Sequence, residues 1–97
     1  MRYEIVFSLE AAEDYKRLKA DIKGRIRDGV EKHLRHDPAS TSRSRIKKLS
    51  GRLRPQYRLR IEEYRVYYDV TRTTVEILAI LTKSESDGWL KKAGEKK

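Results

Sequence analysis

Apolar residues occupy every second position over residues 57–61 and again over 64–70, which predicts two β-strands. The break at Glu62-Glu63 predicts a two-residue hairpin turn or a slightly longer loop, since paired glutamates are unusual in turns. With the two-residue turn, residues directly opposite each other share one face of the sheet. One face then carries Tyr57, Leu59, Ile61, Tyr64, Val66, Tyr68 and Val70. The other face carries Arg58, Arg60, Arg65 and Tyr67.

The first third of the chain changes from this alternation to helical spacing. Residues 2–7 alternate and predict a strand, after which Ser8 is a suitable N-cap for a helix over about residues 9–19. A second helix is expected to begin at Asp21 and to end at Asp37-Pro38, because a residue before proline disfavours the helical conformation. Its apolar stripe recurs every four residues and consists of Ile22, Ile26, Val30 and Leu34.

Two further strands and a last helix are predicted beyond the helices. A short strand is expected at 46–49, and a longer one at 75–81. The longer strand is apolar on both faces, which is typical of a central strand covered on both sides. Ser84-x-x-Asp87 resembles a capping box for a short C-terminal helix.

These elements predict one α+β domain spanning residues 1–97, in the order β-α-α-β-β-β-α. A helical hairpin is expected to pack on one face of a mainly antiparallel, four- to five-stranded sheet, with the arginine-bearing face left open as a shallow concavity. The apolar helical stripe should cover the core of the sheet. That core is predicted to contain Ile5, Leu59, Ile61, Val66, Tyr68, Ile77 and either Leu78 or Ala79.

Charge then narrows the class of partner. The chain has 24 Lys and Arg against 15 Asp and Glu, a net charge of +9 and a pI near 9.9. This balance favours a polyanionic partner, either nucleic acid or an acidic protein. The longest apolar run, 75–81, is too short to span a bilayer and the N-terminus lacks a signal-peptide pattern, so we expect a cytoplasmic protein without a membrane partner. Cysteine is absent from the sequence, which excludes disulfides and thiolate metal sites.

Candidate chemistry lies in the basic residues. Arginines beside an aromatic ring on one sheet face suit a phosphate and a stacked base, although a simply solvated face has the same composition. His33 and His36 lie at the end of the second predicted helix, where a cation favoured by the helix dipole explains them better than catalysis does. The most basic window is the connector before the hairpin, with Arg43, Arg45, Lys47, Lys48, Arg52 and Arg54.

The motifs together resemble the RelE/ParE superfamily of bacterial toxins over nearly the whole chain. The resemblance rests on KKLSG at 47–51, on YRLR-x3-YRVYYDV at 57–70, and on an apolar strand that ends in a cation at Lys83. RelE-type members cleave messenger RNA in the ribosomal decoding site, whereas a ParE branch with the same fold poisons DNA gyrase. The fold alone does not choose between the two branches.

The RelE branch implies catalytic roles for Arg58, Arg60, Arg65 and Lys83. It also implies an RNA-binding surface, which we assign to Lys47, Lys48, Arg52, Arg54, Tyr67 and Trp89. The chain departs from the branch in two ways. The hairpin carries arginines where lysines are frequent, and Trp89 stands where a tyrosine is frequent; arginine does not release a proton and tryptophan has no hydroxyl, so the general base is left open.

The sequence thus predicts the toxin component of a type II toxin–antitoxin system, a metal- and cofactor-independent endoribonuclease that cleaves mRNA on the ribosome. Its expected partners are the ribosome, mRNA and a cognate antitoxin that is acidic and partly disordered when free. The alternatives are a ParE-like gyrase inhibitor and a non-catalytic basic domain that binds RNA or protein.

Overall fold

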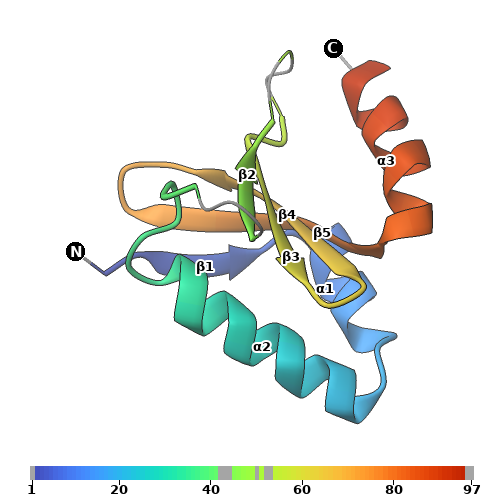
Figure 1. Ribbon diagram of the computed structural model, residues 1–97, viewed down its shortest axis with the longest axis horizontal. Coiled ribbons are helices and arrows are strands. Elements are labelled where there is room, and N and C mark those ends of the chain that lie inside the picture. Colours follow the sequence, from blue (N-terminus) through green and yellow to red (C-terminus); the bar gives the residue numbers. More distant parts are fainter. Residues whose placement is uncertain (1, 42–44, 50, 52–53, 96–97) are drawn as a thin grey trace.

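A computed structural model describes residues 2–41, 45–49, 51 and 54–95, and it confirms the predicted α+β class. A five-stranded sheet separates two helices at the N-terminal end of the chain from one at the C-terminal end (Figure 1). The elements are β1 (Glu4–Phe7), α1 (Leu9–Lys16), α2 (Ala20–Leu34), β2 (Ile46–Lys48), β3 (Tyr57–Ile61), β4 (Tyr64–Val70), β5 (Thr74–Thr82) and α3 (Lys83–Glu95).

The sheet has the strand order β1-β5-β4-β3-β2. β1 runs parallel to β5, and the other neighbouring strands are antiparallel. The predicted hairpin register is confirmed, because Arg58 lies opposite Tyr67 and Arg60 lies opposite Arg65. Glu62 adopts a φ of 55°, which supplies the positive φ that tight hairpin turns require at their first central residue.

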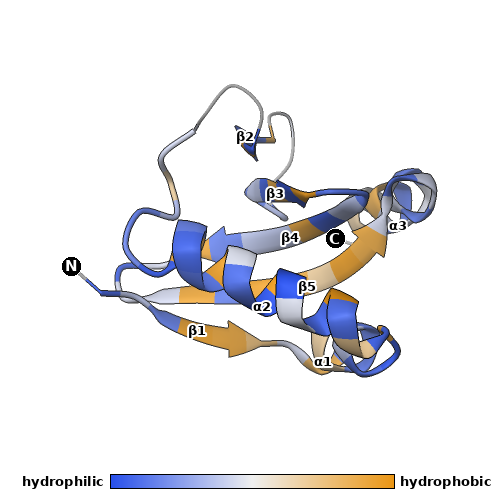
Figure 2. Ribbon diagram, turned by 60° about the horizontal axis from the view of Figure 1, so that its bottom comes forward, coloured by the Kyte–Doolittle hydropathy of each residue, from blue (hydrophilic) through white to orange (hydrophobic). Residues whose placement is uncertain are grey.

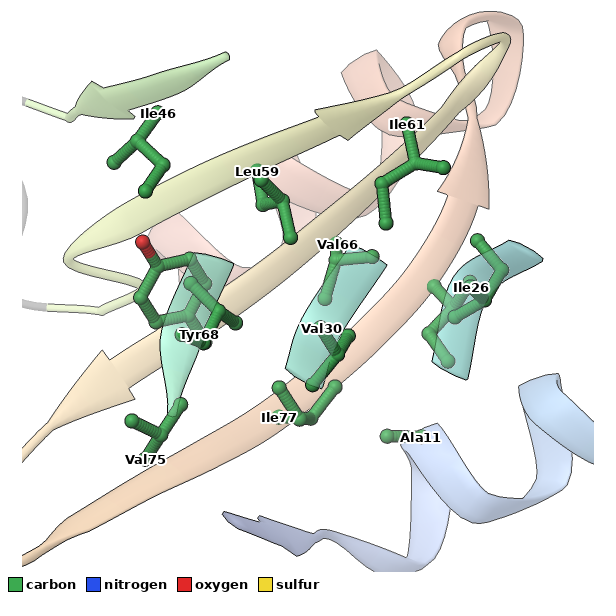
Figure 3. Packing of buried hydrophobic residues seen from close by; sticks show 12 residues of the cluster. Ala11, Ile26, Val30, Ile46, Leu59, Ile61, Val66, Tyr68, Val75 and Ile77 are labelled. Atoms are coloured by element: carbon green, nitrogen blue, oxygen red, sulfur yellow. The ribbon is translucent and has the colours of Figure 1, made fainter. Parts of the chain in front are cut away.

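The helical hairpin packs on the predicted face of the sheet. Ile26, Val30 and Leu34 are buried in the same cluster as the strand residues, and Figure 2 shows α2 lying across the strands. Ile5 and Ile22 are only partly buried and pack at the edge of this core. The predicted strand residues that are buried in the same cluster, drawn in Figure 3, are Leu59, Ile61, Val66, Tyr68 and Ile77.

A bulge between β4 and β5 changes which face the β5 side chains occupy. Tyr67 lies opposite Ala79, whereas the next residue, Tyr68, lies opposite Ile77, so Leu78 is the extra residue on β5. Ala79 is buried, but it shares a face with Tyr67 rather than with the helix-covered core. The prediction that Leu78 or Ala79 joins Ile77 in that core is therefore wrong, because strict alternation does not anticipate an inserted residue.

Side chains at the start of α1 complete the edge of β5 where β1 ends. Ser8 caps α1 by accepting a 3.0 Å hydrogen bond from the Ala11 amide, as predicted. Beyond the last pair of β1 and β5, the Ile80 amide donates to Oδ2 of Asp14 at 3.0 Å. Asp14 is buried, and its carboxylate satisfies a backbone donor that a longer β1 would otherwise have engaged.

The helix boundaries differ from the sequence prediction at four ends, one of which is the end of α2 at Leu34 rather than at Asp37-Pro38. α1 stops at Lys16 rather than near residue 19, and Lys19, not Asp21, is the N-cap of α2. The capping box of α3 lies two residues earlier than predicted. The Thr82 hydroxyl accepts from the Glu85 amide at 3.3 Å, while Glu85 accepts from the Thr82 amide at 2.9 Å.

None of the helices in the described ranges is long and apolar enough to cross a membrane.

Candidate functional site

The sheet face opposite α1 and α2 collects four cations from three adjacent strands. Arg58 and Arg60 lie two residues apart on β3, Arg65 lies opposite Arg60 on β4, and Lys47 lies opposite Arg58 on β2. Because strand neighbours directly opposite each other share a face, these four residues form one group. We call them the cation cluster.

The three arginines of this cluster have no acidic counterpart among the described residues. Carboxylates elsewhere pair with Arg17, Arg25, Arg35 and Arg54. Arg58 also carries a buried Nε atom without a hydrogen-bond partner in the described part of the chain. Buried polar atoms are normally paired, so an unpaired guanidinium nitrogen among other cations is typical of an anion-binding site.

The surroundings of Arg65 shift the pKa of its guanidinium. Burial lowers the pKa of its guanidinium, and the neighbouring charges of Arg58 and Arg60 lower it further, while Tyr67 acts in the opposite direction. Like charges directly opposite on a sheet are destabilising, so this arrangement costs the fold some stability. An anion placed between Arg60 and Arg65 would relieve that cost.

The arginine-bearing face, predicted to be left open, is covered in part, and Tyr67 is buried there. The Tyr67 side chain is only 2% exposed, and its ring stacks on the Trp89 ring with centroids 5.2 Å apart and an angle of 28°. α3 therefore packs over part of the arginine-bearing face, which the period-two pattern of the strands does not reveal. Tyr67 offers no free ring face in this arrangement on which a nucleobase could stack.

Lys83 is exposed at the first position of α3 and borders the cation cluster. It lines an open hollow of ≈ 640 Å³ that also includes Arg65 of β4. Three acidic residues that sequence reasoning did not assign to the site line the same hollow, namely Glu62, Glu63 and Asp87. Asp87 could have been assigned to the site from the sequence, because it follows Lys83 by four residues and residues i and i+4 share a helix face.

The remaining predicted RNA-binding residues have different surroundings. Arg54 pairs with Asp69 at 2.8 Å and with Glu76 at 3.3 Å, so its guanidinium is engaged within the protein. Lys47 and Lys48 are both exposed on β2. The register puts Lys47 opposite Arg58 and Lys48 opposite Tyr57, hence on opposite faces of the sheet. Arg52 lies outside the described residues.

His33 differs from its expected state. Burial lowers the pKa of the imidazole, and the nearby charges of Arg45 and Lys32 lower it further, so the neutral form is favoured. The interpretation of His33 as a dipole-stabilised cation is therefore wrong, because burial and nearby positive charge disfavour the protonated imidazole. His33 and His36 lie at the end of α2, away from the cation cluster on β2, β3 and β4.

The geometry of the cluster suits one kind of chemistry. Planar guanidiniums on adjacent strands can hold a phosphate and stabilise negative charge that develops on it. Arginine remains protonated and cannot act as a base, so any proton transfer must involve other residues. Among the described residues, no group of three or more His, Cys, Asp or Glu side chains is placed to hold a metal ion.

Solved toxin structures share this fold. The RelBE2 toxin–antitoxin complex from Mycobacterium tuberculosis contains a chain with a TM-score of 0.72 and 24% identity, covering 86% of this chain and 100% of that one. The RelB–RelE complex from Methanococcus jannaschii gives 0.66 and 22%, covering 87% and 96% of the two chains. The YoeB dimer from Staphylococcus aureus gives 0.62 and 25%, covering 84% and 97%. No curated protein sequence matches this chain.

The family assignment comes from the sequence match. The model of the family described as the ParE toxin of the type II toxin-antitoxin system, parDE, matches residues 5–86. This range begins in β1 and ends in the first turn of α3, so it includes every strand that carries the cation cluster. The chain therefore belongs to the ParE toxin family, within the RelE/ParE superfamily of type II toxin–antitoxin toxins.

Proposed function

We propose that this chain is a ribosome-dependent endoribonuclease that inhibits translation by cleaving mRNA in the decoding site. The observation that carries the proposal is the set of three arginines, Arg58, Arg60 and Arg65, which share one face of the sheet and have no ion pair with an acidic side chain among the described residues. Opposite charges across strands stabilise a sheet and like charges destabilise it, so stability alone does not favour Arg60 opposite Arg65.

The proposed reaction is an internal phosphoryl transfer. The ribose 2′ oxygen attacks the adjacent phosphorus, and the bond to the 5′ oxygen breaks. Arg58, Arg60 and Arg65 hold the phosphate and stabilise the charge that develops on its oxygens. Lys83, at the rim beside Arg65, supplies a further cation toward the same phosphate. Such a site depends on its substrate being held in a reactive conformation by another surface, and the ribosome provides one.

A second candidate function follows from the family name. The matching model is that of the ParE toxins, and inhibition of DNA gyrase is the alternative activity within this superfamily. A gyrase inhibitor does not require three guanidiniums to converge on one phosphate. The cation cluster therefore favours the ribonuclease.

The test combines two assays on one set of variants. Primer extension on mRNA from cells that express the chain should show cuts within translated codons, and these cuts should disappear in Arg65→Ala and Arg58→Ala. A charge-assisted contact contributes about 1.5–3 kcal/mol, so each substitution should slow cleavage by roughly 10- to 150-fold if the contact acts in the transition state. Intact messages together with trapped gyrase–DNA breaks would instead establish the second candidate, and neither effect would favour a non-catalytic binder.

Arg60→Lys is the control for charge. If Arg60 contributes only a positive charge, lysine should retain part of the cleavage activity, whereas bidentate phosphate binding should be lost. Circular dichroism of each variant checks that the fold is intact.

We also propose that a cognate antitoxin masks the basic surface and that the complex resides in the cytoplasm. The net charge of +9 supports an acidic partner. The structures from M. tuberculosis and M. jannaschii are described as toxin–antitoxin complexes. Mixing the chain with its antitoxin should give a complex that associates more slowly as salt rises.

A further inference from the structure

Tyr67 is the feature of the arginine-bearing face that phosphate binding leaves unexplained. It lies directly opposite Arg58 on β3 and two residues after Arg65 on β4. Its side chain is 2% exposed beneath α3, where the Trp89 ring stacks on it. The Tyr67 phenol therefore shares a sheet face with Arg58 and Arg65.

The hydroxyl of Tyr67 is left available in this arrangement. In the described residues it takes part in no hydrogen bond, and it is not among the fully buried polar atoms that lack a partner, so the small exposed part of Tyr67 includes the hydroxyl. The adjacent Tyr68 is different, because its hydroxyl donates to the Pro38 carbonyl at 2.7 Å on the helix-covered side. Two neighbouring tyrosines therefore have opposite surroundings.

The neighbours of Tyr67 cannot supply a proton at neutral pH. Arg58 and Arg65 retain their protons, and the Trp89 indole has no acidic group. Tyr67 lies within electrostatic reach of Arg65, because it opposes the lowering of the arginine pKa by burial and by the other cations.

We propose that the Tyr67 hydroxyl is the general acid that protonates the 5′ oxygen leaving group, an inference that rests on the proposed ribonuclease function. As the 2′ oxygen forms its bond to phosphorus, its proton passes to solvent water. As the bond from phosphorus to the 5′ oxygen breaks, that oxygen takes the proton of the Tyr67 hydroxyl. The products are a 2′,3′-cyclic phosphate and a 5′-hydroxyl end, and the phenolate then regains a proton from water.

Trp89 acts as a positioning residue in this scheme. Its ring lies against Tyr67 with the geometry of a stacked pair, and it belongs to a helix that follows directly on β5. The stack limits the rotation of the phenol and holds its ring on the arginine-bearing face. This role explains how a tryptophan, which has no hydroxyl, fits the site.

The test uses Tyr67→Phe and Tyr68→Phe as a matched pair. Both changes remove one hydroxyl and keep the ring, but only the first alters the arginine-bearing face. Single-turnover cleavage is measured on ribosomes programmed with two synthetic mRNAs. One carries the normal 5′ oxygen at the mapped cleavage position, and the other carries a 5′ bridging sulfur, a leaving group that departs without protonation.

Tyr67→Phe should slow cleavage of the oxygen substrate by about 10²-fold or more, which is the usual contribution of a general acid, and should cleave the sulfur substrate at nearly the rate of the unchanged chain. Tyr68→Phe should cleave both substrates normally. An equal loss on both substrates, or no loss on either, would overturn the role of Tyr67 while leaving the ribonuclease function intact. If the unchanged chain cleaves neither substrate, the proposed function itself fails.

Discussion

At the scale of single residues, the cation cluster lowers the stability of the fold but supplies the charges that an anionic ligand needs. Arg60 and Arg65 lie directly opposite each other, and burial sharpens the repulsion at Arg65. Such pairs are destabilising in a sheet, and a protein retains them where a ligand needs both charges. The fold must therefore tolerate a local cost that disappears when an anion binds.

Replacing Arg65 by glutamine tests whether the cluster lowers the stability of the fold. We expect Arg65→Gln to raise the free energy of unfolding at low ionic strength, because the repulsion from Arg58 and Arg60 is removed, and we expect the gain to shrink as salt screens the remaining charges. Cleavage should be lost in the same variant. Urea denaturation at two salt concentrations measures the effect, with Arg72→Gln on an exposed turn as the control. A loss of stability in Arg65→Gln would mean that the arginine is structural.

Asp14 gives a second prediction at this scale, through pH. Burial raises the pKa of its carboxyl in the folded protein, although the hydrogen bond from Ile80 and the charge of Arg17 oppose the shift. A raised folded-state pKa means that the folded protein holds the proton more tightly than the unfolded chain does. The contribution of Asp14 to stability is therefore greatest below its unfolded pKa of about 3.9 and falls as pH rises through the folded pKa.

Asp14→Asn should remove this dependence while keeping an oxygen that accepts from the Ile80 amide. Relative to the unchanged chain, the asparagine variant should become more stable as pH rises from about 3 to about 7. Asp14→Leu is the control, since it leaves the Ile80 amide unsatisfied and should destabilise at every pH, by about 1–3 kcal/mol. Stability differences between Asp14→Asn and the unchanged chain that do not vary with pH would contradict the prediction.

At the scale of elements, α2 approaches the sheet closely at Gly29. A Cβ atom placed there would lie 2.6 Å from Cδ1 and 3.0 Å from Cγ1 of Ile61, a core residue of β3. Gly24, which lies in the same helix, has open space around the corresponding position. The helix thus contains two glycines of which only one serves packing.

The two glycines should respond differently to alanine. Gly24→Ala should stabilise the protein by about 0.5–1 kcal/mol, since alanine has the higher helix propensity. Gly29→Ala should not stabilise the protein. It should instead lower the free energy of unfolding by up to about 1–3 kcal/mol, because the new methyl group is overpacked against Ile61. Thermal unfolding of both variants measures the contrast. In the Gly29→Ala background, Ile61→Val should recover stability by removing the atom that the new methyl group meets; an additive loss from the two changes would argue against the contact.

The elements also show what could be predicted from the sequence and what could not. Period-two alternation around a two-residue turn determined the register of β3 and β4, and thereby the shared face of Arg58, Arg60 and Arg65. The position of α3 over Tyr67 was not predictable in this way, because stacking on Trp89 joins segments whose relative placement no local pattern encodes. The ion pairs of Arg54 with β4 and β5 are of the same kind.

The β5 bulge is a third feature that the pattern hid. The strand is apolar at almost every position, so its sequence is equally compatible with either face and carries no sign of an inserted residue. Only the register against β4 shows that Ala79 has moved to the side of the arginines. Alternating strands are therefore predicted more reliably than uniformly apolar ones.

At the scale of the whole molecule, the effect of a positive charge on binding should depend on the face of the sheet that carries it. The chain has a net charge of +9, but five acidic side chains pair with Arg17, Arg25, Arg35 and Arg54 outside the cation cluster. The edge strand β2 makes the difference testable, because Lys47 and Lys48 are adjacent and exposed and lie on opposite faces. Only Lys47 continues the row that contains Arg58.

Lys47→Ala and Lys48→Ala change the net charge equally, so a difference between them reports the binding face rather than total charge. For binding to isolated ribosomes, the logarithm of the affinity falls with the logarithm of salt concentration in proportion to the number of phosphates contacted. Lys47→Ala should reduce the magnitude of this slope by about 1, and Lys48→Ala should leave it nearly unchanged. Filter binding over a series of KCl concentrations measures both slopes. Equal slopes for the two variants would mean that RNA binding depends on the overall charge of the protein. The arginine-bearing face would then not be the RNA-binding surface.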